Sequence, residues 1–203
     1  MIRAEPVFLE RDAVRLEPLG PEHAEGLKAA VSDGELWRLW YTQPPRPEAV
    51  VAYIATALQA QAEGRALPFA VRDLTNGEIV GSTRYHDIAP EVERLEIGFT
   101  WYAKSRQRTA VNTTCKLLLL SHAFDALDAK VVCLLTHSFN FTSQRAIEAL
   151  GAKKDGVLRR HRLRGDGTPS DSVVYSILAQ EWPDVRRNLE FRLERHGVAA
   201  AGS

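Results

Sequence analysis

Residues 94–151 read RLEIGFTWYAKSRQRTAVNTTCKLLLLSHAFDALDAKVVCLLTHSFNFTSQRAIEALG, and this stretch decides the fold. Its first part, Arg94–Tyr102, is rich in aromatic and apolar residues and predicts a strand. A polar loop follows over residues 104–113. From Thr113 onward the apolar residues recur at helical spacing, with Asn112 or Thr113 as the candidate N-cap. We therefore expect a strand that leads through a polar loop into the N-terminus of a helix.

The expected helix N-terminus is a candidate phosphate site. Unpaired backbone N–H groups and the helix dipole place about half a positive charge at such an end, which favours anions. Arg106, Gln107 and Arg108 add side-chain donors beside it. The loop suits a pyrophosphate, although an ordinary capped helix with solvated basic residues explains the same pattern when the loop is taken alone.

A second strand and a short helix complete the stretch. Lys130–Leu135 is a continuous apolar run of strand length, which is typical of a strand buried on both faces. Residues 140–152 predict a short helix, with Thr142 or Ser143 as its cap and Gly151 as a left-handed stop. Capping does not exclude a chemical role for Ser143.

These motifs resemble the GCN5-related N-acetyltransferases (GNAT), in particular the branch of the ribosomal-protein N-terminal acetyltransferases, over roughly residues 7–182. In that family a loop of pattern Gln/Arg-x-x-Gly-x-Gly/Ala binds the pyrophosphate of acyl-coenzyme A. The matching positions here are Gln107, Ala110 and Asn112. Ala110 replaces a glycine whose missing side chain lets the backbone approach phosphate, and Asn112 replaces a glycine or alanine. The resemblance thus implies a variant cofactor loop.

The segment from Asn140 to Ala152 resembles the family's Asn-x-x-Ser-x-x-x-x-x-x-Leu-Gly-Phe motif, with Ala152 in the place of Phe. The resemblance implies that Asn140 hydrogen-bonds the pantetheine arm, and that Ser143 lies near the thioester sulfur and protonates the departing thiolate. The residues it implies for acetyl-coenzyme A, or another acyl-coenzyme A, are Arg106, Gln107, Arg108, Thr109, Ala110, Val111, Asn112, Thr113, Asn140, Ser143 and Arg145.

Acyl transfer from a thioester to an amine passes through an oxyanion, which a backbone N–H of the strand Arg94–Tyr102 is expected to stabilise. The amine must arrive neutral, so a base is needed. The candidates are Glu96, Glu93, His86 and His137, and Glu96 is preferred because a carboxylate among apolar neighbours needs a partner or a function. A structural ion pair is an equally good explanation of Glu96.

The acceptor side is less clearly marked. Trp37, Tyr41, His86 and His161 are the candidate substrate contacts, although Trp37, Trp40 and Tyr41 have a spacing more often found in a core, and His86 is more often a packing or turn residue. Arg159 and Arg162 are candidates for contacts with the acceptor or with an acyl carboxylate such as that of succinyl-coenzyme A. They belong to a basic strip over residues 153–164, for which a solvated strand face is the plainer interpretation.

The resemblance implies one α/β (α+β) domain with a central mixed, mostly antiparallel sheet flanked by helices, and with splayed central strands that hold acyl-coenzyme A. At 203 residues, with no composition break, a single domain is expected over residues 1–182. It is followed over 183–203 by a C-terminal helix to about Arg195 and a frayed tail from Gly197. The other expected elements are a strand over 13–19, helices from 21 and over 48–62, and antiparallel hairpins over 67–85, with an Asn76-Gly77 turn, and 156–178.

Composition limits the kinds of partner, cofactor and location that we expect for the chain. Lys plus Arg equal Asp plus Glu at 26 each, which argues against nucleic acid and against an anionic membrane. Cys115 and Cys133 lack metal-like spacing, so we expect no metal. The N-terminus lacks a signal sequence and no apolar run reaches the ~18 residues of a membrane span, so a cytoplasmic location is expected. On family grounds a homodimer is plausible.

Two functions from different classes remain. The first is an enzyme that moves an acyl group, most often acetyl, from coenzyme A to a primary amine of a small molecule or to a protein N-terminus. The second is a non-catalytic member that binds acyl-coenzyme A or a protein partner and has lost turnover through the changes at Ala110 and Asn112. The presence of Ser143 favours the enzyme.

Overall fold

The computed structural model describes residues 2–3 and 5–201, and the side chains among them as far as Arg195. The described residues form an eight-stranded sheet in the order β1-β2-β3-β4-β5-β6-β8-β7. The strands are β1 (Leu9–Arg11), β2 (Val14–Pro18), β3 (Ala66–Asp73), β4 (Ile79–Ala89), β5 (Arg94–Tyr102), β6 (Val131–His137), β7 (Lys153–Leu163) and β8 (Pro169–Leu178). The helices are α1 (Ala24–Ser32), α2 (Val50–Ala62), α3 (Ala110–Ser121), α4 (Phe141–Glu148) and α5 (Trp182–Ala201).

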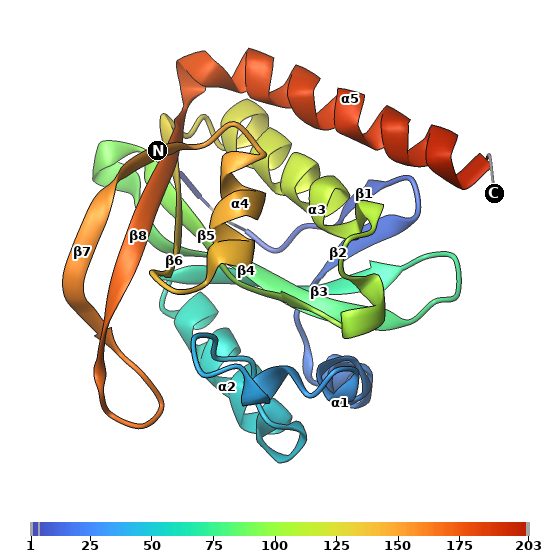
Figure 1. Ribbon diagram of the computed structural model, residues 1–203, viewed down its shortest axis with the longest axis vertical. Coiled ribbons are helices and arrows are strands. Elements are labelled where there is room, and N and C mark those ends of the chain that lie inside the picture. The colour runs from blue at the N-terminus through green and yellow to red at the C-terminus, as the bar shows by residue number, and fades with distance from the viewer. Residues whose placement is uncertain (1, 4, 202–203) are drawn as a thin grey trace.

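Helices cover both faces of the sheet (Figure 1). The larger core lies under α3 and α5, where Leu119 and Leu189 are fully buried. The smaller core lies under α1 and α2, where Leu27 and Ala57 are fully buried. Burial of these apolar faces is the main stabilising contribution to such a layered domain.

The sheet opens in its middle, between β5 and β6. These two strands are parallel. In the described chain Arg94–Glu96 pair with Val131–Cys133, while the later residues of β5 and β6 do not pair with each other. All the other neighbouring strands are antiparallel. The expected mixed, mostly antiparallel sheet with splayed central strands is therefore confirmed.

A bulge in β5 lies beside this opening. Arg84 of β4 faces Gly98, and Ser82 faces Trp101, so the register shifts at Phe99. Phe99 adopts a left-handed backbone conformation with φ of 50°, which is unusual for a bulky residue. Such a bulge bends a strand and re-aims its side chains. The bend therefore lies in the part of β5 that has left its partner β6.

Most expected elements are confirmed, with differences at their ends. The strand Arg94–Tyr102 is confirmed at both ends, and the turn between β3 and β4 has Gly77 at φ 77°. The prediction of Asn112 or Thr113 as the N-cap is wrong, because Thr109 caps α3 with its Oγ1, which accepts the backbone N–H of Val111. The helix therefore begins before the expected polar loop ends.

The other corrections also concern helix ends. Thr142 and Ser143 do not cap α4, because Asn140 is the N-cap and its Oδ1 accepts the backbone N–H of Ser143 at 3.1 Å. The terminal helix runs to Ala201 rather than to about Arg195, and positions 202 and 203 of the expected frayed tail lie outside the described residues.

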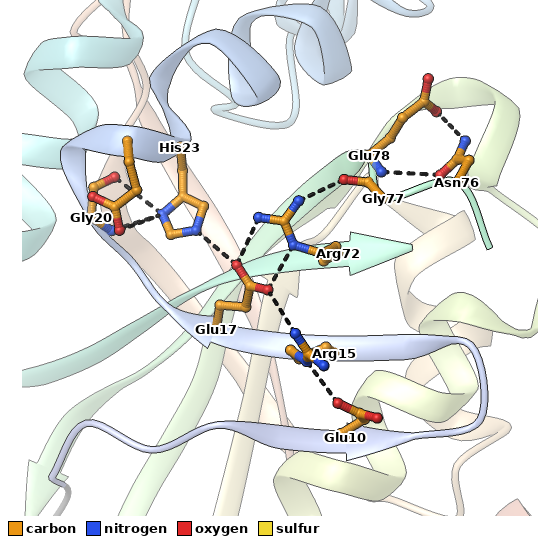
Figure 2. Close-up of polar contacts among 10 residues, drawn as sticks. Glu10, Arg15, Glu17, Gly20, His23, Arg72, Asn76, Gly77 and Glu78 are labelled. Carbon is orange, nitrogen blue, oxygen red and sulfur yellow. Dashed lines mark hydrogen bonds and ion pairs between the residues drawn. The ribbon is translucent and has the colours of Figure 1, made fainter. Parts of the chain in front are cut away.

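A partly buried ion cluster connects β2 and β3 to the start of the first helical segment (Figure 2). Glu17 of β2 accepts two hydrogen bonds from Arg72 of β3, at 2.6 and 2.9 Å, and lies 3.1 Å from His23 Nε2. The backbone N–H of Gly20 donates to His23 Nδ1, so Nε2 carries the proton that faces Glu17. The Arg72 hydrogen bonds are the largest cause that lowers the pKa of Glu17 to about 2, and His23 adds to them against the opposing effect of burial.

Candidate functional site

The N-terminus of α3 lies at the end of the loop that follows β5. Thr109 Oγ1 occupies one N–H group of the first turn, and Ala110 leaves the helix end without a large side chain. Gln107 turns its amide back to donate to the carbonyl of Tyr102 at 3.1 Å. A helix end of this kind favours a phosphate.

The basic residues of this loop differ in their environment. The guanidinium of Arg106 lies 3.2 Å from Asp73 and 3.5 Å from Glu78, so its charge is already paired on the hairpin of β3 and β4. Arg108 is exposed, in a left-handed conformation with φ of 64°. Arg108 is therefore better placed than Arg106 to meet an anion.

The other side of the opening is formed by β6 and α4. Asn140 uses its Oδ1 as the cap of α4, while Ser143 is half-buried in the first turn and Arg145 is exposed. In the part of the chain that the structure describes, the Ser143 hydroxyl makes no hydrogen bond with the protein. It is therefore available to donate to a ligand.

The buried acid Glu96 has a partner. Its Oε1 lies 3.0 Å from His86 Nε2, and Glu96 is 4% exposed. Gly98 makes this contact possible, because a Cβ at that position would lie 2.3 Å from His86 Nε2. Arg162 approaches the same Oε1 from β7 at 3.8 Å. Three strands thus bring a carboxylate, an imidazole and a guanidinium together.

Arg84 lies on β4 two residues from His86, so both side chains face the same side of the sheet. Its guanidinium carbon is 4.1 Å from the centre of the Phe99 ring and 4.9 Å from that of Tyr53. No signal in the sequence singles out Arg84, because an arginine in an alternating strand ordinarily faces solvent.

Trp40 belongs to an exposed aromatic group rather than to the core, so the expectation of a core position is wrong for it. The Trp40 side chain is 56% exposed and packs edge-on against His137, with Arg164 lying 5.1 Å from the centre of one of its rings. Burial and Arg164 lower the pKa of His137, in that order of size. Trp37 packs partly buried on the smaller core, and Tyr41 is half-buried beside Trp40.

The remaining candidates lie on β7. His161 is exposed, and its Nδ1 lies 3.1 Å from the Ser172 hydroxyl. Arg159 pairs with Asp171 at 3.0 Å. Most of this basic strip is solvent-exposed, in line with the plainer interpretation, but Arg162 and Arg164 reach the residues described above.

Lys116 is a buried cation outside the residues expected from the sequence to form the site. It lies on α3, is 6% exposed, and donates from Nζ to the Thr100 hydroxyl of β5 at 3.1 Å. Burial lowers its pKa to about 8. Its position one helical turn from Thr113 and Leu120, both buried, was a usable signal, because a lysine on an apolar helix stripe is unusual.

Two features are absent from the residues that the structure describes. No described helix has the length and apolarity that crossing a membrane requires. Among these same residues, no group of three or more His, Cys, Asp or Glu side chains is arranged to hold a metal ion.

Comparison with known proteins gives consistent results. Residues 13–153 match the family model described as an acetyltransferase (GNAT) domain. The uncharacterized N-acetyltransferase YoaA of Bacillus subtilis (strain 168) is 26% identical over 172 residues, which cover 84% of this chain and 96% of that protein. A presumed acetyltransferase from T. thermophilus superposes with a TM-score of 0.82 at 38% identity, covering 94% of this chain and 98% of that one. RimJ of Mycobacterium smegmatis, solved with CoA-disulfide, shares the fold with a TM-score of 0.75 at 21% identity, over 92% and 93% of the two chains.

Proposed function

Because the chain belongs to the GNAT acetyltransferase family, we propose that it moves an acetyl group from acetyl-coenzyme A directly to a primary amine of a small molecule or a protein N-terminus. The observation that carries this proposal is the opening between β5 and β6, with the N-terminus of α3 on one side and the Glu96–His86 pair near the last paired residues. A binding module needs the first feature but not the second.

The residues present fit coenzyme A. The α3 N-terminus with Ala110 and Asn112 would hold the pyrophosphate, helped by Arg108, because backbone N–H groups of a first helical turn have no partner within the helix. The unpaired edges of β5 and β6 would meet the amide groups of the pantetheine arm, with Asn140 nearby. When bound, the cofactor supplies an activated acyl group and a thiolate that must be protonated on leaving.

The two proton transfers of the reaction are assigned to the Glu96–His86 pair and to Ser143. Glu96 and His86 would remove the proton of the attacking amine, because their 3.0 Å contact holds the two groups together as a positioned base beside the opening. Ser143 would protonate the leaving thiolate, since its hydroxyl is half-buried at the α4 end of the opening. The backbone N–H groups of β5 beyond Glu96 are the candidate donors to the developing oxyanion.

The test is release of free thiol from acetyl-coenzyme A by the purified protein across a panel of amines and peptides with free N-termini. We expect saturable cofactor binding by calorimetry and thiol release that depends on the acceptor. Glu96→Gln should reduce the rate while leaving cofactor affinity within about twofold, because general-base catalysis contributes about 10²-fold or more. Lack of binding to acetyl-coenzyme A would contradict the proposal.

The alternative is a GNAT-like protein that binds acyl-coenzyme A without turnover. It keeps the α3 end and Asn140 but does not use the Glu96–His86 pair. Saturable binding without thiol release on any amine, and unchanged behaviour of Glu96→Gln, would favour this alternative.

A further inference from the structure

Arg84 is a buried cation that has no acidic partner among the residues that the structure describes. It is 5% exposed, and its Nε is fully buried with no hydrogen-bond partner among the residues that the structure describes. No carboxylate of those residues forms an ion pair with it. A buried charge without a partner is strongly unfavourable, so such groups are normally paired. The missing partner is therefore expected from outside the described chain.

Two aromatic rings hold the guanidinium in place. Phe99 and Tyr53 lie against it at 4.1 and 4.9 Å, and the Tyr53 hydroxyl is fixed by the Ser82 hydroxyl at 3.2 Å. Contacts with ring faces leave the N–H groups in the guanidinium plane free to bind an anion. Phe99 is 46% exposed and belongs to the β5 bulge, so this stack borders the opening of the sheet.

The acid on this face of the sheet is already engaged. Glu96 is held by His86 at 3.0 Å and by Arg162 at 3.8 Å, and it forms no ion pair with Arg84 among the described residues. Arg84 and His86 lie two positions apart on one strand, which places their Cα atoms about 7 Å apart. A group that can take a proton from an amine and a group that can bind an anion therefore lie next to each other.

We propose that Arg84 binds a carboxylate of a substrate; the first source of that carboxylate is the acceptor, which would then be a short amine that also carries a carboxylate. This inference rests on the proposed function, because it places the acceptor amine at the Glu96–His86 pair. The same carboxylate chemistry has a second source, the acyl group of a dicarboxylic acyl-coenzyme A such as succinyl-coenzyme A. Two arms of one binding experiment separate the two sources.

The first arm measures acceptors. The full-length protein, saturated with coenzyme A, is titrated calorimetrically with leucine, phenylalanine and β-alanine, each against its own carboxamide. We expect the acid of at least one pair to bind about tenfold or more tightly than its amide, because a charge-assisted hydrogen bond contributes about 1.5–3 kcal/mol. Arg84→Met should reduce that preference to less than about twofold and leave the affinity of the amide unchanged, with Arg84→Lys in between.

The second arm compares succinyl- with acetyl-coenzyme A on the same proteins. If the acyl group supplies the carboxylate, the preference for the succinyl compound appears in the wild-type protein and disappears in Arg84→Met. The inference is overturned if neither the acids nor succinyl-coenzyme A bind more tightly than their uncharged counterparts, or if Arg84→Met weakens acids and amides equally.

Two features keep the test decisive. The comparison of acid with amide in the wild-type protein needs no variant, so it stands even if Arg84→Met fails to fold. The binding readout is also independent of turnover. Absence of acetyl-coenzyme A binding would overturn the proposed function, whereas cofactor binding without any preference for a carboxylate would overturn only the role of Arg84.

Discussion

Replacing Lys116 by methionine should stabilise the protein at neutral pH. Burial lowers the pKa of this lysine from 10.5 to about 8. Above pH 10.5 the amine is neutral in both the folded and the unfolded state. Between pH 10.5 and pH 8 the unfolded chain binds the proton more readily than the folded protein, so the free energy of unfolding falls as the pH falls. Below about pH 8 the whole loss of stability is present. At about 1.4 kcal/mol per pKa unit the loss is about 3 kcal/mol.

The hydrogen bond from Lys116 to Thr100 offsets part of this loss, by about 1 kcal/mol. Lys116→Met should therefore raise the free energy of unfolding by about 2 kcal/mol near pH 7, and by less than about 1 kcal/mol near pH 9.5, where the native lysine is mostly neutral. Methionine is chosen because it fills nearly the same space as lysine without the charge, so the substitution tests the charge rather than the packing.

The measurement is urea unfolding of the wild type and the variant at both pH values. The difference between the two proteins is the relevant quantity, because the groups that do not contact Lys116 titrate in the same way in both. The exposed Lys154→Met serves as the control and should change stability by less than about 0.5 kcal/mol. A variant less stable than the wild type near pH 7, or a difference that does not depend on pH, would refute the reasoning.

Three more substitutions test other parts of the molecule. Glu17→Gln should lower the free energy of unfolding by about 3 kcal/mol at pH 7 and by about 1 kcal/mol at pH 3. The reason is that the stability from the lowered pKa of Glu17 is present above pH 4.5 and is lost as the pH falls through about 2. Equal differences in urea unfolding at both pH values would contradict this. Gly98→Ala should displace His86 and abolish most thiol release. Gly156→Ala, where an added Cβ meets nothing within 4 Å, is the control and should not. Comparable rates for the two variants would rule out the role of Gly98 in positioning His86. Ser143→Ala should lower turnover by about 10²-fold or more and leave the calorimetric affinity for acetyl-coenzyme A within about twofold, with Thr142→Ala as the control. Equal losses in rate and in affinity would show that Ser143 is not the acid that protonates the thiolate.

The architecture was predictable from the sequence because its signals are local. The strand Arg94–Tyr102, the Asn76-Gly77 turn and the left-handed Gly151 are each determined by neighbouring residues. Helix starts were predicted less well, since Thr109 and Asn140 each took the N-cap position in place of polar residues nearby. Several adjacent polar residues can cap a helix, and sequence alone does not rank them.

The candidate site was predictable only in part, because its contacts join distant segments. Glu96 was recognised as a buried acid, but its partner His86 comes from another strand and Arg162 from a third. Arg84 was missed, because its burial between two rings depends on a bulge and on a helix far away in sequence. The roles assigned to Ser143 and Asn140, the homodimer and the cytoplasmic location stay predictions.

The short joint between β5 and β6 has a mechanical consequence. Strands β1–β5 form one continuous hydrogen-bonded ladder and β6, β8 and β7 form another, while among the described residues three pairs, Arg94–Glu96 with Val131–Cys133, link the two. A ligand with amide groups that lay in this gap would supply backbone hydrogen bonds that β5 and β6 do not form with each other there. Binding of such a ligand would then be linked to the stability of the sheet, and amide hydrogen exchange in both groups of strands would slow when the ligand binds.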